Sequence, residues 1–305
     1  MEQRPQTSLQ AATSFWDTPG GIQEQRANQC WLTKPYVRQY VIETIGSGRL
    51  LWPVEWLKSL YPTRFGRGLS IGCGSGALER SLMTLDVCER VDAFDGAVGS
   101  LDDARQQAAA HGWSERLRYF AADFNTIALP RDTYDIVFFN QSLHHVARLE
   151  YLLREVHRAL KPDGLLYADE YVGPSRHQWT PDRLTIHQII YGFLPPEWRY
   201  YDRVPAPIEY DDPSEAIRSS EILPQMSVGF DIVQRRDYGG TLLSILIPII
   251  NWSVAPEEFQ RNLIIAEREW LLAGGESYMT VVVARPKRGI AGMLANVRYL
   301  SRSRP

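Results

Sequence analysis

Cysteine is scarce in this sequence of 305 residues, which contains only Cys30, Cys73 and Cys88. Three cysteines without the spacing of a metal site indicate neither a disulfide framework nor a zinc centre. We therefore expect no bound metal and a reducing, cytoplasmic environment. The first residues also lack the apolar stretch of a secretory signal peptide, so secretion is not expected.

Long hydrophobic runs and a large excess of charge are missing as well. The longest apolar run, residues 242–252, is far shorter than the roughly 20 residues of a transmembrane helix, so we expect it to be a buried helix. A formal net charge of −3 provides no overall attraction for nucleic acid, and no nucleic-acid partner is expected. With 44% hydrophobic residues, the chain is long enough for one large domain with an insertion.

What the sequence does contain is a glycine-rich turn. Gly72, Gly74 and Gly76 follow a short apolar strand and precede a helical pattern that begins at Ala77. Glycine allows the backbone to reverse sharply and allows main-chain N–H groups to approach a ligand closely. The turn is typical of nucleotide-cofactor sites, and its spacing also satisfies the dinucleotide pattern G-x-G-x-x-A. The glycines alone therefore leave the class of cofactor open.

Strand and helix patterns alternate after this turn. We predict strands at 90–95, 117–121, 134–140 and 165–170, and helices at 77–85, 100–111 and 149–160. Later segments add strands at 230–235 and 278–284 and helices at 241–250 and 256–273. This order predicts an α/β fold with an open, doubly wound, mostly parallel sheet.

Polar residues end three of the predicted strands. In an open parallel sheet ligands bind at the carboxyl ends of the strands, which here are Asp95, Asp123 and Asn140. The Asp95 carboxylate could accept hydrogen bonds from both hydroxyls of a ribose, and Asp123 could accept the exocyclic amine of an adenine. The plainer alternatives are a helix cap for Asp95 and a turn residue for Asp123.

This combination resembles the class I S-adenosylmethionine-dependent methyltransferases of the small-molecule type. The resemblance covers residues 66–172 and includes the glycine turn, the three strand ends and the Lys-Pro-Asp-Gly turn at 161–164. It implies S-adenosylmethionine as cofactor, S-adenosylhomocysteine as product and a Rossmann-like sheet of seven strands. It also implies that the turn contacts the methionine part and that the backbone near Asn140 meets the methionyl amine. The cofactor residues predicted in this way are Gly72, Cys73, Gly74, Ser75, Gly76, Asp95, Gly96, Ala122, Asp123, Phe124, Asn140 and Gln141.

One position departs from the family pattern. Ser70 stands where the first strand of the family often carries an acid, so a contact to the methionyl amine is either lost or supplied by another group. Two alternatives to methyl transfer remain open at this point. One is an NAD-type oxidoreductase, which residues 1–65 ahead of the turn disfavour, and the other is a scaffold that binds the cofactor without catalysis.

Two adjacent histidines, His144 and His145, follow the strand that ends at Asn140, at the mouth where a methyl acceptor would bind. Both are predicted as catalytic candidates because an imidazole can take a proton near neutral pH. Capping of the next helix or packing against the cofactor is the plainer interpretation. Nearby Asp169, Glu170 and His177 could bind a metal, as a His and carboxylate cluster does in some O-methyltransferases, but they show no recognisable ligand spacing. Ordinary polar contacts in a loop are the plainer interpretation.

The predicted organisation has five parts. They are an N-terminal helical cover (1–62), a cofactor-binding core (63–173), a proline-rich and aromatic lid (174–228), the last two strands with their helices (229–286) and a basic tail (287–305). Most lid aromatics are expected in the core of the lid, although they could also line an acceptor pocket; these are Trp179, Tyr191, Phe193, Trp198, Tyr200, Tyr201 and Tyr210.

The predicted acceptor is a small molecule, methylated by in-line displacement and most often at oxygen in enzymes of this kind. Nitrogen and carbon remain alternatives, and the oligomeric state is open. The tail mixes apolar residues with several arginines and could touch an anionic membrane surface, although a solvated terminus is the plainer interpretation.

Overall fold

The computed structural model describes residues 30–289, 292, 294 and 297–299. Much of the predicted N-terminal cover and most of the predicted basic tail therefore lie outside the described residues. The cover is represented by α3 (Pro35–Gly46) and α4 (Pro53–Leu60), each of which has proline in its first turn. Proline suits this position because the first N–H groups of a helix have no partner within the helix.

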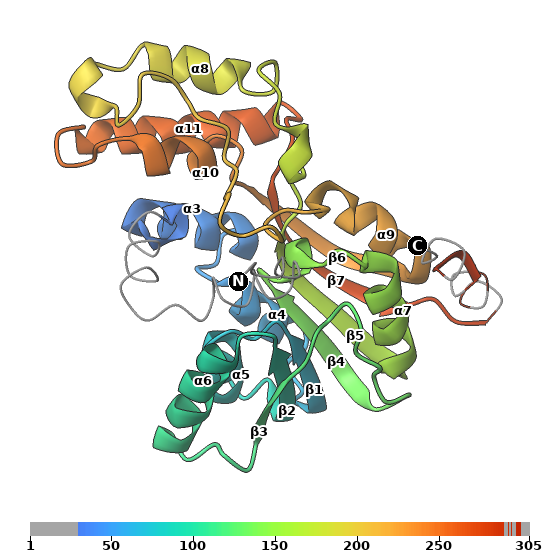
Figure 1. Cartoon of the computed structure of the whole chain (residues 1–305). Helices are drawn as coiled ribbons and strands as arrows, with labels where there is room; N and C mark the ends of the chain where they lie inside the picture. The colour runs from blue at the N-terminus through green and yellow to red at the C-terminus, as the bar shows by residue number, and fades with distance from the viewer. Residues whose placement is uncertain (1–29, 290–291, 293, 295–296, 300–305) are drawn as a thin grey trace, which may run out of the picture.

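Seven strands form one sheet in the order β3-β2-β1-β4-β5-β7-β6 (Figure 1). The strands are β1 (Phe65–Ile71), β2 (Cys88–Asp95), β3 (Leu117–Ala121), β4 (Tyr134–Asn140), β5 (Leu160–Tyr171), β6 (Phe230–Gly239) and β7 (Met279–Pro286). Strands β1 to β5 pair in parallel, whereas β7 runs antiparallel to β5 and β6. The predicted doubly wound, mostly parallel sheet is confirmed.

Helices cover both faces of the sheet (Figure 1). On one face, α5 (Ala77–Thr84) and α6 (Val98–Ala110) share a hydrophobic core with α3 and α4. On the other, α7 (Leu149–Ala159) and α9 (Ile222–Gly229) pack together against the sheet. The apolar residues of α7 recur every three or four positions, so all of them are buried on the side that faces the sheet.

A further group of helices lies beyond the sheet and consists of α8 (Thr185–Gly192), α10 (Leu243–Leu246) and α11 (Glu257–Leu272) (Figure 1). The buried carboxylate of Glu267 on α11 accepts the backbone N–H groups of Thr241, Leu242 and Leu243 at 2.7–3.0 Å. It thereby satisfies donors that the start of α10 leaves unpaired. Because α8 packs against α10, the predicted lid forms one helical group with later parts of the chain.

Two predicted elements have different bounds. Strand β5 begins at Leu160, and the Lys-Pro-Asp-Gly segment forms an irregularity within this strand, between the pairs Tyr134/Leu160 and Ile136/Leu165. The helix predicted at 241–250 is a short α10 followed by the 3₁₀ helix η6 (Ile247–Ile249). Pro248 lies in η6 and has no N–H group with which to continue an α-helix.

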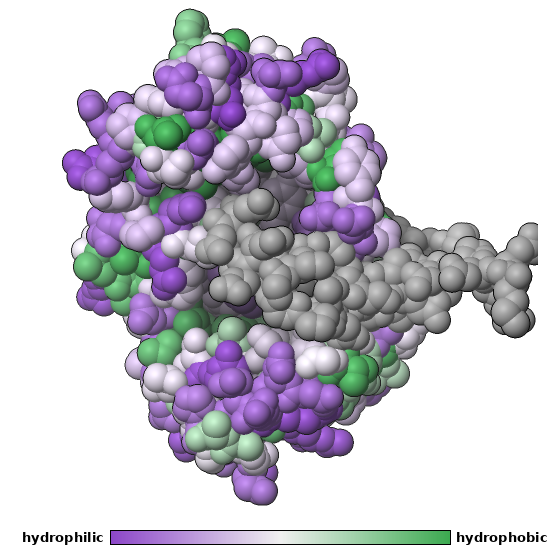
Figure 2. Space-filling model, turned by 60° about the vertical axis from the view of Figure 1, so that its left-hand side comes forward, coloured by the Kyte–Doolittle hydropathy of each residue, from purple (hydrophilic) through white to green (hydrophobic). Residues whose placement is uncertain are grey.

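The side of the molecule shown in Figure 2 is mainly hydrophilic, and its hydrophobic residues lie in separate spots. This matches a chain whose large apolar side chains fill the two cores on either side of the sheet. Among the described residues, no helix combines the length and the apolar character needed to cross a membrane.

Candidate active site

A cavity opens at the carboxyl ends of β1, β2, β3 and β4, beside the point where the strand order changes direction between β1 and β4. It contains about 860 Å³ of empty space, part of which is open to solvent. All of the predicted cofactor residues line it except Ser75 and Gly76. The fold therefore brings four strand ends to one place, although they are far apart in the sequence.

The glycine turn shapes the cavity through left-handed backbone conformations. Gly72, Gly74 and Gly76 have φ angles of 71°, 50° and 79°, which residues with a Cβ atom rarely adopt. A Cβ on Gly72 would lie 2.5 Å from the Cβ of Ser142, so the cavity wall leaves no room for a side chain there. A Cβ on Gly76 would instead meet Tyr119, which shows that Gly76 packs between elements outside the cavity.

Asp95 ties the glycine turn to the next helix. Its Oδ2 accepts the N–H of Gly74 at 2.8 Å, and its Oδ1 accepts the N–H of Ala97 at 2.9 Å. A carboxylate has about four lone-pair sites, so two more hydrogen bonds can be accepted on the cavity side. This arrangement fits the two hydroxyls of a ribose.

Asp123 and Phe124 form the neighbouring wall. Oδ1 of Asp123 accepts the backbone N–H of Asn125 at 2.8 Å, which fixes the turn after β3. The structure thus gives Asp123 the turn role expected as its plainer interpretation, and it also places the residue in the cavity wall beside a half-buried aromatic ring. An adenine ring between an acceptor and an aromatic side chain is compatible with this wall.

Gln141 turns the chain from β4 toward the histidines. Its φ of 54° is left-handed, and both its backbone N–H and its side-chain amide donate to the carbonyl of Asp169, at 2.8 and 3.0 Å. Strain of this kind persists where surrounding contacts enforce it, often at functional sites. The turn leads into the 3₁₀ helix η2 (Leu143–His145), which carries both predicted catalytic residues.

His145 lies in the cavity wall, as Asp123 does. Its Nδ1 is 3.0 Å from the hydroxyl of Ser214, which itself donates to Asp212 at 2.6 Å. Because the Ser214 hydroxyl donates its proton to Asp212, its oxygen is the acceptor in the contact with His145. Nδ1 of His145 is therefore assigned as the donor, and Nε2 carries the lone pair. Burial lowers the pKa of His145, and the adjacent His144 adds to this effect, so the neutral base is favoured at pH 7.

His144 is buried behind the cavity and does not line it. Its Nδ1 donates to the carboxylate of Glu170 at 2.8 Å, and its Nε2 is 3.7 Å from Glu215. Burial acts to lower the pKa of His144, but the carboxylates of Glu215 and Glu170 outweigh it and raise the pKa to about 9. His144 is thus expected to be protonated at neutral pH.

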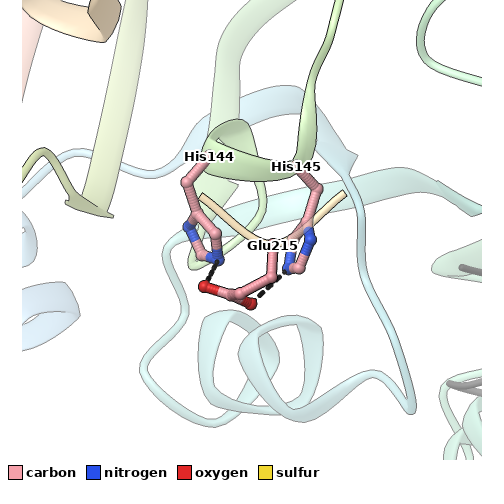
Figure 3. Close-up of side chains that lie close together, drawn as sticks. All are labelled: His144, His145 and Glu215. Atoms are coloured by element: carbon pink, nitrogen blue, oxygen red, sulfur yellow. Dashed lines mark ion pairs between the residues drawn. The ribbon is translucent and has the colours of Figure 1, made fainter. Parts of the chain in front are cut away.

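Glu215 completes the group, because both imidazoles point toward its carboxylate from the same short helix (Figure 3). The distances from Nε2 of His144 and of His145 to the nearest carboxylate oxygen are 3.7 and 3.6 Å. Sequence reasoning missed Glu215, Ser214 and Asp212, since they lie in an irregular segment about 70 residues after the histidines with no recognisable motif.

Other predicted candidates lie elsewhere. His177 is exposed and is not in the group of metal-ligating atoms formed by His144, His145 and Glu215. None of the seven lid aromatics is in the cavity wall. Trp179, Tyr191 and Trp198 pack against the hydrophobic core, whereas Phe193, Tyr200, Tyr201 and Tyr210 are exposed.

Behind the glycine turn, Glu79 of α5 supplies a buried acid close to Ser70. Burial raises the pKa of Glu79 to about 7, and the Ser70 hydroxyl opposes the rise. A buried acid thus lies close to position 70, but it comes from the following helix and is not in the cavity wall. The sequence signal was an acid beside Leu78 on the buried side of a helix, which is unusual for glutamate.

The fold and the site together define a class of protein. A doubly wound sheet with a glycine turn after its first strand and acids after the next two belongs to the Rossmann-like proteins that bind a nucleoside-containing cofactor. The imidazole of His145 in the cavity wall places an acid–base group beside that cofactor site.

Comparisons with known proteins narrow this class. Residues 69–168 match the methyltransferase domain family. The malonyl-[acyl-carrier protein] O-methyltransferase of Legionella pneumophila is 29% identical over 41% of this chain and 42% of its own length. The sterol 24-C-methyltransferase of Pneumocystis carinii is 27% identical over 41% of this chain and 32% of its own length. The match therefore spans less than half the length of each of these relatives.

Solved structures agree on the fold. A S-adenosylmethionine-dependent methyltransferase of Leishmania major superposes with a TM-score of 0.52 and 16% identity, covering 91% of this chain and 83% of its own. The [4+2]-cyclase SpnF gives a TM-score of 0.51 and 16% identity, covering 93% and 98%. Residues 69–168 therefore match the methyltransferase domain family. The described fold is that of class I S-adenosylmethionine-dependent methyltransferases, whose methyl donor is S-adenosylmethionine.

Proposed function

We propose that this chain transfers a methyl group from S-adenosylmethionine to the oxygen of a small-molecule acceptor. The observation that carries the proposal is one cavity whose wall contains Asp95, Asp123 and His145. The first two residues suit the ribose and the adenine, and the third suits an acceptor hydroxyl. Asn140 and Gln141 also line this wall, and the methionyl part would bind beside them.

The bound cofactor would supply an electrophilic methyl group on a sulfonium. The protein's own task is then to align the acceptor oxygen in line with the S–C bond, which can contribute about 7–11 kcal/mol through positioning. As the O–C bond forms and the S–C bond breaks, Nε2 of His145 takes the hydroxyl proton. Ser214 and Asp212 hold the imidazole in the tautomer that this step requires.

The acceptor class is part of the proposal. The relatives named above act on an acyl-carrier-bound malonyl group and on a sterol carbon, so they do not decide between oxygen and carbon. An imidazole with a lowered pKa beside the cavity favours an acceptor that must lose a proton, and a hydroxyl is such a group.

Cofactor binding can be measured without knowing the acceptor. We expect S-adenosylhomocysteine to raise the melting temperature, and Asp95→Asn to weaken its affinity about 10- to 100-fold because a charged hydrogen-bond acceptor is lost. The exposed Asp103→Asn on α6 is the matched control and should bind like the wild type. Stabilisation by NAD in place of S-adenosylhomocysteine would contradict the proposal.

Transfer is tested by a second experiment. With methyl-labelled S-adenosylmethionine and a panel of hydroxylated compounds, His145→Ala should lower turnover about 10²- to 10⁴-fold while S-adenosylhomocysteine affinity stays near that of the wild type. The exposed His177→Ala serves as control. A cofactor that binds without any methylated product would favour a scaffold, or chemistry other than methyl transfer.

A further inference from the structure

The cluster formed by His144, His145 and Glu215 has the geometry of a metal site. One nitrogen from each imidazole and one carboxylate oxygen all lie within 4.8 Å of one another. An ion bonded to such atoms at about 2.0–2.2 Å in a tetrahedral arrangement holds them about 3.3–3.6 Å apart. Nε2 of His144 is 3.7 Å from Oε1 of Glu215, and Nε2 of His145 is 3.6 Å from Oε2 of Glu215. Both distances are longer than hydrogen bonds, and the two rings flank the carboxylate (Figure 3).

The residues that orient the two histidine rings also indicate a metal site. Nδ1 of His144 is held by the Glu170 carboxylate, and Nδ1 of His145 is held by the Ser214 hydroxyl, which Asp212 orients. Both rings are thereby fixed with Nε2 toward Glu215. Histidines that bind metals almost always donate their other ring N–H to a carboxylate or a similar acceptor, which orients the ring and strengthens the ligand.

Charge favours a cation at this point. Three carboxyl groups, from Glu170, Asp212 and Glu215, face two imidazoles whose ring centroids are only 4.3 Å apart. A single divalent ion between one nitrogen of each imidazole and one oxygen of Glu215 would place positive charge where these carboxyl groups converge.

We propose that His144, His145 and Glu215 bind one divalent first-row transition-metal ion at the acceptor end of the cavity. Two imidazoles and one carboxylate form a ligand set typical of catalytic zinc and of non-haem iron sites, with positions open for a substrate oxygen. Asp212 and Glu170 act as positioning residues behind the ligands. Three protein ligands leave a coordination position open for the acceptor. His145 lines the cavity, so an acceptor bound there would reach the ion from the side of His145.

This inference deepens the proposed function and rests on it, since the ion would replace His145 in activating the acceptor. Without an ion, the lone pair on Nε2 of His145 takes the proton of the acceptor. With an ion, the same lone pair binds the ion. With the ion bound, the acceptor hydroxyl would bind it through oxygen and release its proton to water. The oxygen would then form the O–C bond as the S–C bond breaks, giving the methyl ether and S-adenosylhomocysteine.

The experiment measures metal binding directly on the full chain after treatment with a chelator and gel filtration. Zn²⁺ is titrated calorimetrically, and Co²⁺ is followed by its visible absorption. We expect one ion per chain, with the affinity lowered at least about 100-fold by Glu215→Gln and by His145→Ala, and about 10- to 100-fold by Asp212→Asn. The exposed Asp211→Asn, in the same loop, is the control and should bind like the wild type.

The outcome separates this inference from the proposed function. Glu215 is partly exposed, so Glu215→Gln should fold even if His145→Ala does not. Absence of binding in the wild type, or equal binding in wild type and Glu215→Gln, would overturn the metal site. S-adenosylhomocysteine binding and methyl transfer measured on the same metal-free samples show independently whether the proposed function stands.

Discussion

Gly72→Ala should destabilise the fold by about 2–5 kcal/mol and abolish cofactor binding. About 1–2 kcal/mol would come from placing a Cβ at a left-handed φ, and about 1–3 kcal/mol from overpacking. The overpacking arises because the new Cβ would lie 2.5 Å from the Cβ of Ser142, across the cavity wall. Urea denaturation measures the free energy of unfolding, and calorimetry measures S-adenosylhomocysteine affinity.

Gly74 provides the matched control for this prediction. It shares the left-handed conformation, with φ of 50°, but a Cβ there would have no atom within 4 Å. Gly74→Ala should therefore show only the conformational part, about 1–2 kcal/mol. Adding Ser142→Gly to Gly72→Ala should recover part of the lost stability, because it removes the clashing Cβ. If Gly72→Ala proves no more harmful than Gly74→Ala, the clash is not real.

The second large effect concerns Glu170, whose carboxylate is buried beneath the histidines. It accepts the backbone N–H groups of Ser142 at 2.7 Å and Leu143 at 2.6 Å, as well as Nδ1 of His144. Glu170→Ala leaves all three donors without this acceptor in a buried site, so we expect a loss of about 3–5 kcal/mol in the free energy of unfolding. Urea denaturation is again the measurement.

A surface ion pair serves as the comparison. Asp102 on α6 pairs with Arg105 at 2.7 Å, but its side chain is 71% exposed. Asp102→Ala should therefore change stability by no more than about 1 kcal/mol. Glu170→Gln, which keeps the size of the side chain, should fall between the two. A Glu170→Ala variant as stable as Asp102→Ala would mean that the buried carboxylate does not hold η2 in place.

Elements with strong periodicity or clear ends could be predicted from the sequence. The strand from Tyr134 to Asn140 is an example, because its run of apolar residues suits the buried middle of a parallel sheet. The structure of the segment from Leu160 to Gly164 could not be predicted from the sequence. Its Lys-Pro-Asp-Gly sequence is typical of a turn, yet pairing with β4 draws it into the start of β5.

The candidate site also contains residues that could be placed from the sequence and residues that could not. Asp95 and Asp123 could be placed in it from their positions after strands, because parallel strands bring their carboxyl ends to one edge of the sheet. The aromatic residues of the lid could not be placed, because their packing depends on how α8 meets α10. Tyr191 is buried in the core, whereas Tyr210 is exposed.

By itself, the sequence determined the order of strands and helices, the glycine turn and the acids beside it, and hence the resemblance to the methyltransferase family and its donor. These features are local, since a few neighbouring residues determine the backbone conformation and the hydrophobic period. Only the tertiary structure decided what surrounds the histidines. Glu215, Ser214 and Asp212 reach them from an irregular segment with no period of its own, and only the folded chain brings these side chains within a few ångströms of His144 and His145.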